Sequence, residues 1–277
     1  MKDLKIFTSN IEDKAREQID LLLEQEPFKD CKIRIMPDVH AGAGCVIGFT
    51  GNLGDKVIPN IVGVDIGCGM LCVELGNIDI NLEKLDQVIR KYVPSGMNVH
   101  QELLDIIPNF SYFINENNLK KLKCYKELKN KDNWLEKSIG TLGGGNHFIE
   151  IDVDEDNNKY LVIHTGSRNL GKQVAEIYQN KAIEYCSYKE EMKQEIQDTI
   201  KEYKEQGRQQ EIQQKLIEIH KKYEGKTKLP KDLCYLEGKL REDYLHDMEI
   251  CQKFAKTNRI IIKCRKTFFV DMGVICK

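Results

Sequence analysis

Apolar residues recur along the chain in short runs that are separated by glycine, proline and polar residues, a pattern typical of strands joined by turns. Strands are predicted at four of these runs: Lys32–Met36, Cys45–Thr50, Met70–Leu75 and Tyr160–His164. The last of them feeds a turn at residues 165–168, after which helical spacing begins. Several turns are dense in glycine, so polar side chains beside them could converge from different strands.

Other stretches carry apolar residues three or four positions apart, which predicts amphipathic helices. Asn10 and Asn81 can each accept a hydrogen bond from the first turn of such a helix, so we expect both to be N-caps. Pro27 should end the first of these helices. A lysine-rich helix is expected from about Asn118 to Leu128.

The segment 188–224 is more highly charged than the rest and keeps apolar residues at four-three spacing on both sides of Gly207. These apolar residues are Ile196, Ile200, Tyr203, Ile212, Leu216, Ile219 and Tyr223. The pattern predicts a long helical hairpin inserted into the chain. Such a hairpin could be a platform for nucleic acid or a partner protein, but a purely structural insertion is the interpretation that we favour.

Composition narrows the class of protein. Of the 277 residues, 41% are hydrophobic and 31% are charged, a composition that suits a soluble globular protein. The length is compatible with a single domain over residues 1–277. No apolar run is long enough to span a membrane, and the first residues lack the pattern of a signal peptide, so we expect a cytoplasmic protein. The net charge of −2 argues against binding of polyanions through bulk charge alone.

Four potential metal ligands lie beside glycines at the ends of apolar runs: Asp65, Cys68, His147 and His164. A carboxylate, a thiolate and two imidazoles are ligands that a divalent metal accepts. Each histidine alone would more often be a hydrogen-bonded core residue, but the four together favour a metal site. Thiolate and imidazole favour zinc, the carboxylate leaves room for a harder ion such as manganese, and a bridging thiolate could hold two ions. The remaining cysteines form no CxxC pair and are expected to be reduced.

Two further segments could bind phosphate. The glycine triplet before Asn146 has open backbone amides, and on a strand residues 146, 148 and 150 would share one face while His147 faced the other. Asn146 and Glu150 could then contact a ligand while His147 turned to the metal. The turn that ends at Arg168 precedes a helix, so it is either a phosphate site or an ordinary helix cap with a surface arginine.

Several of these segments, taken together and in order, resemble the RtcB family of RNA ligases. The segments are residues 37–44 (PDVHAGAG), 62–70 (VGVDIGCGM), 140–150 (GTLGGGNHFIE) and 164–168 (HTGSR), followed by Tyr235–Gly238, Tyr244–Met248 and Asn258–Arg259. The resemblance spans roughly residues 30–259. It implies a mixed α/β (α+β) fold in which central β-sheets are wrapped by helices, and the local patterns agree with this fold class.

The resemblance also implies an activity. Members of the family use GTP and manganese to join an RNA 3′-phosphate or 2′,3′-cyclic phosphate end to a 5′-hydroxyl end, in RNA repair and tRNA splicing. By motif position, Asp65, Cys68 and His147 would hold one manganese ion, and Cys68 and His164 a second. The residues implied to contact the guanine nucleotide are Asn146, His147, Phe148, Ile149 and Glu150. Arg168 would contact the RNA phosphate, and the implied partners are RNA, GTP and an archease-type activator.

One part of the family pattern has no match. Family members continue past the segment that Asn258–Arg259 resembles, and that continuation carries another metal histidine and the histidine that becomes guanylylated. No histidine follows His246 in this sequence. We therefore expect a chain that is C-terminally truncated relative to the family, with no catalytic nucleophile of its own and with a possible separate C-terminal polypeptide as partner. A metal-dependent phosphoesterase and a non-catalytic module that binds metal or RNA ends are the alternatives.

Overall fold

The structure is a computed structural model that describes residues 3–52, 54–103 and 119–264. Its contacts divide the chain into two compact units. The first unit comprises Met1–Val62 and Tyr178–Arg241, and the second comprises Gly63–Ile177 and Glu242–Lys277. Each unit therefore contains segments that are distant in the sequence.

The first unit is built around a three-stranded sheet in the order β1 (Asp3–Ile6), β2 (Lys32–His40) and β3 (Ile47–Gly51). Strand β1 is parallel to β2, and β3 is antiparallel to it. Helix α1 (Asp13–Glu24) packs buried apolar residues against this sheet, among them Ala15 and Ile19, in a core that also contains Ile33. The strands predicted in this part of the sequence are confirmed, although β3 begins two residues later than predicted.

The predicted cap at Asn10 is wrong. Helix α1 begins at Asp13, and its N-cap is Glu12, which makes no side-chain cap hydrogen bond. Instead, the Glu12 carboxylate accepts a hydrogen bond from the backbone N–H of Ala41 at 2.6 Å. A contact with a residue far along the chain therefore fixes the start of the helix, and local cap chemistry does not. Helix α1 ends before Pro27, which lies in the 3₁₀ helix η1 (Glu26–Phe28).

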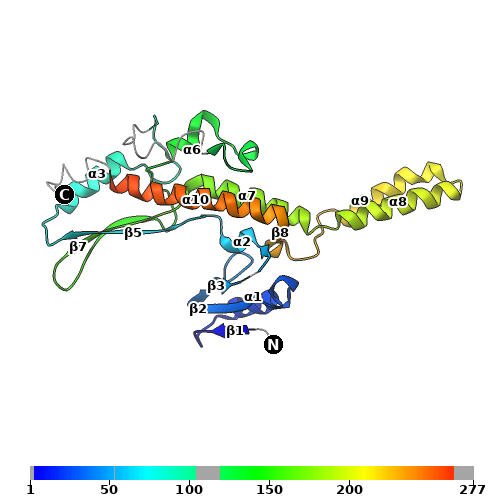
Figure 1. The fold of residues 1–277 in the computed structure, drawn as a ribbon, viewed down its shortest axis with the longest axis horizontal. Coiled ribbons are helices and arrows are strands. Elements are labelled where there is room, and N and C mark those ends of the chain that lie inside the picture. The colour runs from blue at the N-terminus through cyan, green and yellow to red at the C-terminus, as the bar shows by residue number, and fades with distance from the viewer. Residues whose placement is uncertain (1–2, 53, 104–118, 265–277) are drawn as a thin grey trace. The chain divides into compact units, whose positions relative to one another are not determined.

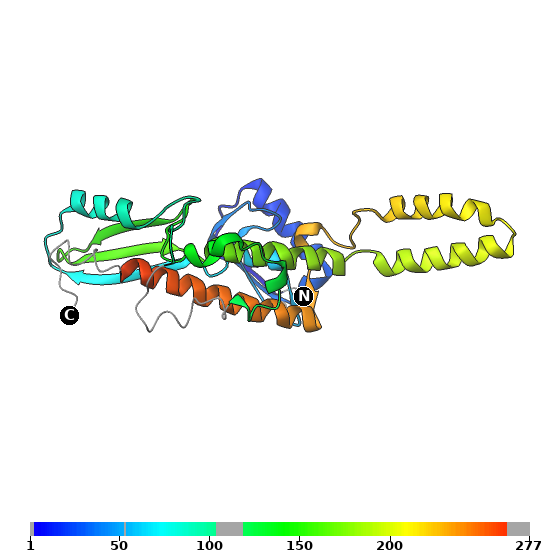
Figure 2. The same ribbon diagram turned by 90° about the horizontal axis from the view of Figure 1, so that it is seen from above.

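The predicted helical hairpin is confirmed in the first unit. Helices α8 (Lys189–Glu205) and α9 (Ile212–Tyr223) run side by side, and the short turn η4 (Gln209–Glu211) follows Gly207 between them (Figures 1 and 2). Tyr203 and Ile219 are buried between the helices. Elsewhere in this unit, β4 (Lys56–Val57) pairs with β8 (Leu236–Glu237), and two short helical segments, α2 (Pro59–Val62) and η5 (Lys231–Leu233), complete it.

The second unit contains an antiparallel sheet in the order β5 (Gly69–Gly76), β7 (Lys159–Thr165) and β6 (Phe148–Val153). One face packs against helix α3 (Leu82–Tyr92) and Ile262, and Leu161 and Ile163 of β7 are buried there. Across the sheet His164 is opposite both Met70 and Phe148, so these three side chains share the other face. The sheet therefore separates a hydrophobic core from a face that carries His164. Both strands predicted in this unit are confirmed.

Helices complete the second unit. Asn81 caps α3 as predicted, because its side chain accepts a hydrogen bond from the Lys84 N–H at 2.8 Å. Helices α7 (Arg168–Tyr185) and α10 (Gly238–Lys263) each cross the boundary between the units, and α7 confirms the helix predicted after the 165–168 turn. Shorter helical segments precede β6: η2 (Tyr125–Glu127), η3 (Lys131–Asn133) and α6 (Trp134–Lys137).

The predicted lysine-rich helix over 118–128 is wrong for its described part, residues 119–128. This stretch forms successive turns and the short segment η2. The reason is Asp247 of α10, a fully buried carboxylate that accepts hydrogen bonds from the backbone N–H groups of Lys123 and Cys124 at 2.8 and 3.0 Å. These N–H groups would otherwise be available to a helical ladder.

No described helix is long and apolar enough to cross a membrane.

Candidate metal centre

A tight turn brings Asp65 and Cys68 together immediately before β5. The Cys68 N–H donates to the Asp65 carbonyl at 3.0 Å, and Gly67 between them has a φ of +81°. A side chain at Gly67 would meet the Gln252 Cα at 2.9 Å, so the turn requires glycine for its backbone conformation and for its close approach to α10. Asp65 and Cys68 therefore lie at the two ends of one tight turn.

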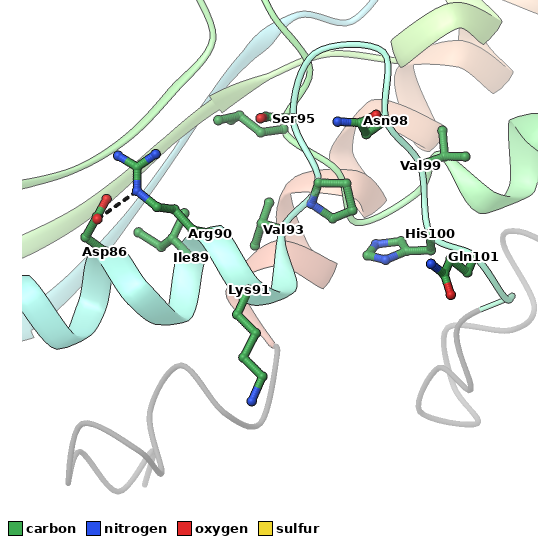
Figure 3. A pocket seen from close by; sticks show the side chains of 12 residues that line it. Asp86, Ile89, Arg90, Lys91, Val93, Ser95, Asn98, Val99, His100 and Gln101 are labelled. Atoms are coloured by element: carbon green, nitrogen blue, oxygen red, sulfur yellow. Dashed lines mark hydrogen bonds and ion pairs between the residues drawn. The ribbon is translucent and has the colours of Figure 1, made fainter.

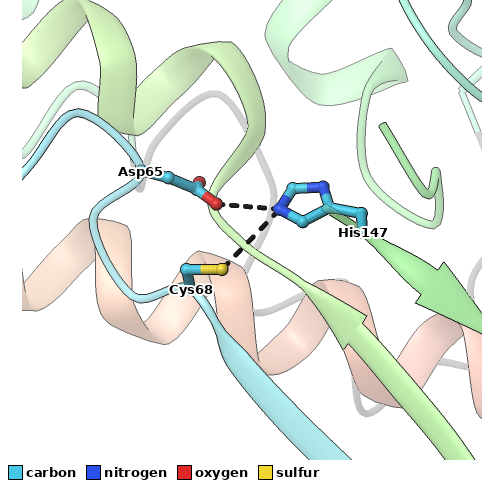
Figure 4. Close-up of side chains that lie close together, drawn as sticks. All are labelled: Asp65, Cys68 and His147. Atoms are coloured by element: carbon cyan, nitrogen blue, oxygen red, sulfur yellow. Dashed lines mark hydrogen bonds and ion pairs between the residues drawn. The ribbon is translucent and has the colours of Figure 1, made fainter. Parts of the chain in front are cut away.

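His147 reaches the same point from the segment before β6 (Figure 4). Its Nε2 lies 2.9 Å from Asp65 Oδ2 and 3.6 Å from Cys68 Sγ. Its Nδ1 lies 3.0 Å from the Leu142 carbonyl, which can only accept, so we assign the ring proton to Nδ1. The Nε2 lone pair then points at the carboxylate and the thiol, as it would in a metal ligand oriented by its second nitrogen.

His164 adjoins these three residues through Cys68. Its Nε2 lies 3.1 Å from the Cys68 sulfur, and its ring is 5.5 Å from that of His147. The Phe148 ring packs edge-on against His164 at 5.1 Å. Cys68 therefore lies between two imidazoles, with Asp65 on the side of His147.

The donor atoms of Asp65, Cys68 and His147 lie within 4.8 Å of one another and fit a divalent cation. Ligand atoms that share one such ion lie roughly 3 to 3.8 Å apart, given metal–ligand distances of about 2.0–2.3 Å. An unprotonated Nε2 facing a carboxylate places two acceptors together, which a cation between them would relieve. The mixed donor set suits zinc and also accommodates a harder ion such as manganese.

Burial and charge act on both ends of the turn. Burial raises the pKa of the Asp65 carboxyl, but a hydrogen bond from His147 Nε2 when both ring nitrogens carry protons, a hydrogen bond from Cys68 and the nearby charge of Arg168 outweigh burial, so that pKa lies below its usual value. Burial and the Asp65 carboxylate raise the pKa of the Cys68 thiol to about 12. At neutral pH and without metal, Asp65 is therefore ionised and Cys68 is protonated.

We expect metal affinity to rise with pH. A metal needs the Cys68 thiolate, so binding at neutral pH must release the thiol proton, whereas Asp65 is already ionised and adds no pH dependence there. The apparent association constant should increase about tenfold per pH unit between about pH 6.5 and 8. Isothermal titration with Zn²⁺ in buffers of different ionisation enthalpy measures both the slope and the released proton. An affinity that is constant or falls with pH would contradict thiolate ligation.

Two residues of α10 hold the loops that carry these side chains. Asn258 is fully buried; its Oδ1 accepts from the N–H groups of Gly140 and Thr141, and its Nδ2 donates to the Thr141 carbonyl. Arg259 donates from Nη1 to the carbonyls of Gly67 and Thr165, at 3.0 and 2.6 Å. The Asn258–Arg259 motif was visible in the sequence, but this supporting role depends on contacts across more than 90 residues.

Arg168 lies against the same loops and begins α7 with a φ of +57°. Its Nε donates to Thr141 Oγ1 at 2.9 Å, and its Nη2 donates to the Gly96 carbonyl at 3.0 Å. The alternative of an ordinary surface arginine does not describe it, because the guanidinium is tied to two separate loops. Contact with an RNA phosphate stays a prediction.

The residues predicted to contact the nucleotide do not all lie on one strand. Strand β6 begins at Phe148, so Asn146 and His147 belong to the preceding loop, and the expected alternation starts two residues late. Phe148 and Glu150 share the sheet face that carries His164, whereas Ile149 packs into the core on the other face. Asn146 and Glu150 are exposed, which leaves them accessible to a ligand.

A divalent-metal centre built on glycine turns of a mixed α/β protein is the class of site that this geometry defines. The chain belongs to the RtcB family: the family model described as tRNA-splicing ligase RtcB matches residues 23–271. The RNA-splicing ligase RtcB of Escherichia coli (strain K12) is 28% identical over 281 residues, which cover 92% of this chain and 58% of that protein. The tRNA-splicing ligase RtcB of Archaeoglobus fulgidus is 33% identical over 187 residues, which cover 50% of this chain and 38% of that protein. The tRNA-splicing ligase RtcB of Nanoarchaeum equitans is 30% identical over 188 residues, which cover 52% of this chain and 39% of that protein.

Proposed function

We propose that this chain provides the metal-binding and RNA-end-binding part of an RtcB-type RNA ligase. The reaction is the joining of an RNA 3′-phosphate or 2′,3′-cyclic phosphate end to a 5′-hydroxyl end, with GTP and manganese. The observation that carries this proposal is the grouping of Asp65, Cys68 and His147 within 4.8 Å in a chain of this family. The chain spans 58% of the length of the Escherichia coli relative, so the activity of the whole protein is itself part of the proposal.

In this proposal Cys68 is shared by two manganese ions. Asp65 and His147 complete one set of ligands, and His164 contributes to the other, in keeping with the position of the Cys68 sulfur between the two imidazoles. Bound there, the ions would neutralise negative charge that develops on a reacting phosphate. The Leu142 carbonyl holds His147 with its Nε2 toward the metal, and Arg259 holds the turn that carries Cys68.

The remaining roles concern substrates and partners. Asn146, His147, Phe148 and Glu150 would contact the guanine nucleotide, whereas Ile149 would hold the same segment from the core side, and Arg168 would bind the terminal RNA phosphate. The exposure of Asn146 and Glu150 supports a ligand at this edge of β6. An archease-type activator is the further partner that we propose.

Arg168 gives a direct test of RNA-end binding. We expect Arg168→Ala to weaken binding of RNA that ends in a 3′-phosphate by about 10- to 150-fold, the value of a charge-assisted bidentate contact of about 1.5–3 kcal/mol. Binding of the same RNA with a 3′-hydroxyl should change much less. Fluorescence anisotropy with both RNAs measures the difference, and Arg16→Ala, an exposed arginine of α1, is the matched control. An equal loss of affinity for both RNAs would show that Arg168 attracts RNA only through its general positive charge.

The joining reaction separates the proposed function from its alternatives. The chain, alone and with any polypeptide that co-purifies with it, is incubated with 3′-phosphate RNA, 5′-hydroxyl RNA, GTP and Mn²⁺. The proposed function predicts that the mixture with all components joins the two RNAs. The joining should require GTP, and the Asp65→Ala variant should not join them. Release of phosphate without GTP would favour a phosphoesterase, and binding of RNA ends with no chemical change in any mixture would favour a non-catalytic module.

A further inference from the structure

The second unit contains two adjoining hollows beside the metal centre, with volumes of about 800 and about 500 Å³. They share the lining residues Val99, His100 and Gln101, and the two hollows together are here named the basic groove. The larger hollow is lined by the end of α3 and by residues 93–101 (Figure 3). The smaller one is lined by residues from 129 to 137 and by Asn169 of α7.

Residues that line the basic groove also hold residues of the metal centre in position. Leu142 lines the larger hollow, and its carbonyl is the group that accepts the Nδ1 proton of His147. The Leu142 N–H donates to the Pro94 carbonyl at 2.9 Å, and Pro94 lines the same hollow. Arg168 donates to the carbonyl of Gly96, next to Ser95 of the lining. A ligand in the groove would therefore lie behind the loop that holds His147 and Arg168.

The groove is positively charged in a chain whose net charge is −2. Its basic lining residues are Arg90, Lys91, Lys129, Lys131 and Lys137. The acidic ones are Asp86 and Asp132, and the Asp86 carboxylate is paired with Arg90 at 2.7 Å. Basic side chains gathered along a depression attract a phosphate backbone even when the protein as a whole is acidic.

Trp134 is the single tryptophan of the chain and lines the smaller hollow, half-buried, at the start of α6. The two residues before it, Asp132 and Asn133, both have left-handed backbone conformations, with φ of 55° and 56°. Asp and Asn adopt this conformation more readily than other residues with side chains, and here the two lead directly into α6. The Gln173 side-chain amide binds the start of this segment by accepting from the Lys129 N–H at 2.7 Å and donating to its carbonyl at 3.0 Å.

We propose that the basic groove binds the single-stranded RNA segment that leads to the end held at the metal centre. One base stacks on Trp134, and the backbone phosphates lie along Lys129, Lys131 and Lys137. An aromatic face beside a row of cations is the arrangement by which proteins hold single strands without reading their sequence. In a duplex the bases are stacked within the helix, so a duplex cannot use Trp134. This inference rests on the proposed function, from which RNA is taken as the ligand.

The single tryptophan allows a direct measurement. An unstructured 12-nucleotide RNA with a 3′-hydroxyl is titrated into the wild-type chain without added metal, and the tryptophan emission is recorded. Stacking of a base on Trp134 should quench this emission, whereas a duplex of the same length should quench it much less. Saturable quenching by the single strand supports the proposal; binding of the single strand without any quenching overturns the role of Trp134.

Variants then separate stacking from charge, with affinity measured by anisotropy of labelled RNA and folding checked by circular dichroism. Trp134→Ala should weaken binding of the single strand about 5- to 150-fold, and Trp134→Phe, which keeps an aromatic face, should restore most of it. Lys131→Ala/Lys137→Ala should reduce the slope of log K against log salt by about 1.4, two phosphate contacts at about 0.7 each. The matched control is Lys201→Ala/Lys204→Ala, which removes two exposed lysines of α8.

A double lysine variant in the groove that behaves like the control would overturn the groove as the path of the RNA. The outcome for the proposed function is read separately, from the Arg168→Ala comparison of 3′-phosphate and 3′-hydroxyl RNA. Groove binding without any preference for the 3′-phosphate would support this inference and count against the proposed function. A 3′-phosphate preference without groove binding would overturn this inference and leave the proposed function in place.

Discussion

Replacing Asp65 or Cys68 by alanine is expected to lower the affinity for Mn²⁺ and Zn²⁺ by roughly 100-fold or more. Each substitution removes one donor from a set of three, and loss even of a group that only orients a ligand typically costs 10- to 100-fold. The Cys68 substitution should have the wider effect, because its sulfur lies near both His147 and His164. Isothermal titration and metal content by mass spectrometry measure both losses.

The matched control for Cys68→Ala is Cys72→Ala. Cys72 is also exposed, lies on β5 four residues after Cys68, and falls on the sheet face that carries His164, but it is not part of the metal-ligand set. Cys72→Ala should bind metal as the wild type does. Equal stoichiometry and affinity in Cys68→Ala and the wild type would remove Cys68 from the site.

A second large effect is expected at Gly166, which binds nothing itself. A side chain added there would meet Asp65 Oδ1 at 2.1 Å, so Gly166→Ala must displace the Asp65 carboxylate. Ligands have to stay within about 0.5 Å of their positions, and we expect metal affinity to fall at least about tenfold. Titration with Zn²⁺ measures the loss, and thermal melting checks that the variant is folded.

Two comparisons decide whether Gly166→Ala acts through Asp65. Gly144→Ala is the matched control, because its added carbon would lie 3.7 Å from the nearest atom, an ordinary contact, and it should bind metal normally. In the double variant with Asp65→Ala, the Gly166 substitution should cause no further loss, since the group that it displaces is already absent. Additive losses would show that Gly166→Ala disturbs the centre by another route.

The parts of the fold and site that sequence predicts well depend on short segments. The turn from Asp65 to Cys68 is set by Gly67 within four residues, and the cap at Asn81 is made three residues away. The hairpin around Gly207 likewise follows from the spacing of its own apolar residues. In each case the side chains that decide the structure are near neighbours in the chain, so their pattern is visible.

The predictions that failed were decided by distant residues. Asn10 loses the helix cap because Glu12 engages Ala41, and the lysine-rich helix is replaced by turns because Asp247 takes its backbone N–H groups. Asn258 likewise holds the loops of the site through hydrogen bonds to residues more than 90 positions away in the sequence. The basic groove could not be predicted either, because Trp134 and the end of α3 are brought together only by the fold.

The central claim is that Asp65, Cys68 and His147 hold one divalent ion, and titration with Co²⁺ tests it most directly. Thiolate ligation gives Co²⁺ a near-ultraviolet charge-transfer band that carboxylate and imidazole ligands do not produce. We predict that this band saturates in the wild type and in Cys72→Ala, is absent in Cys68→Ala, and requires more Co²⁺ to appear in Asp65→Ala and His147→Ala. A wild type without the band, or a Cys68→Ala variant that retains it, would contradict the account.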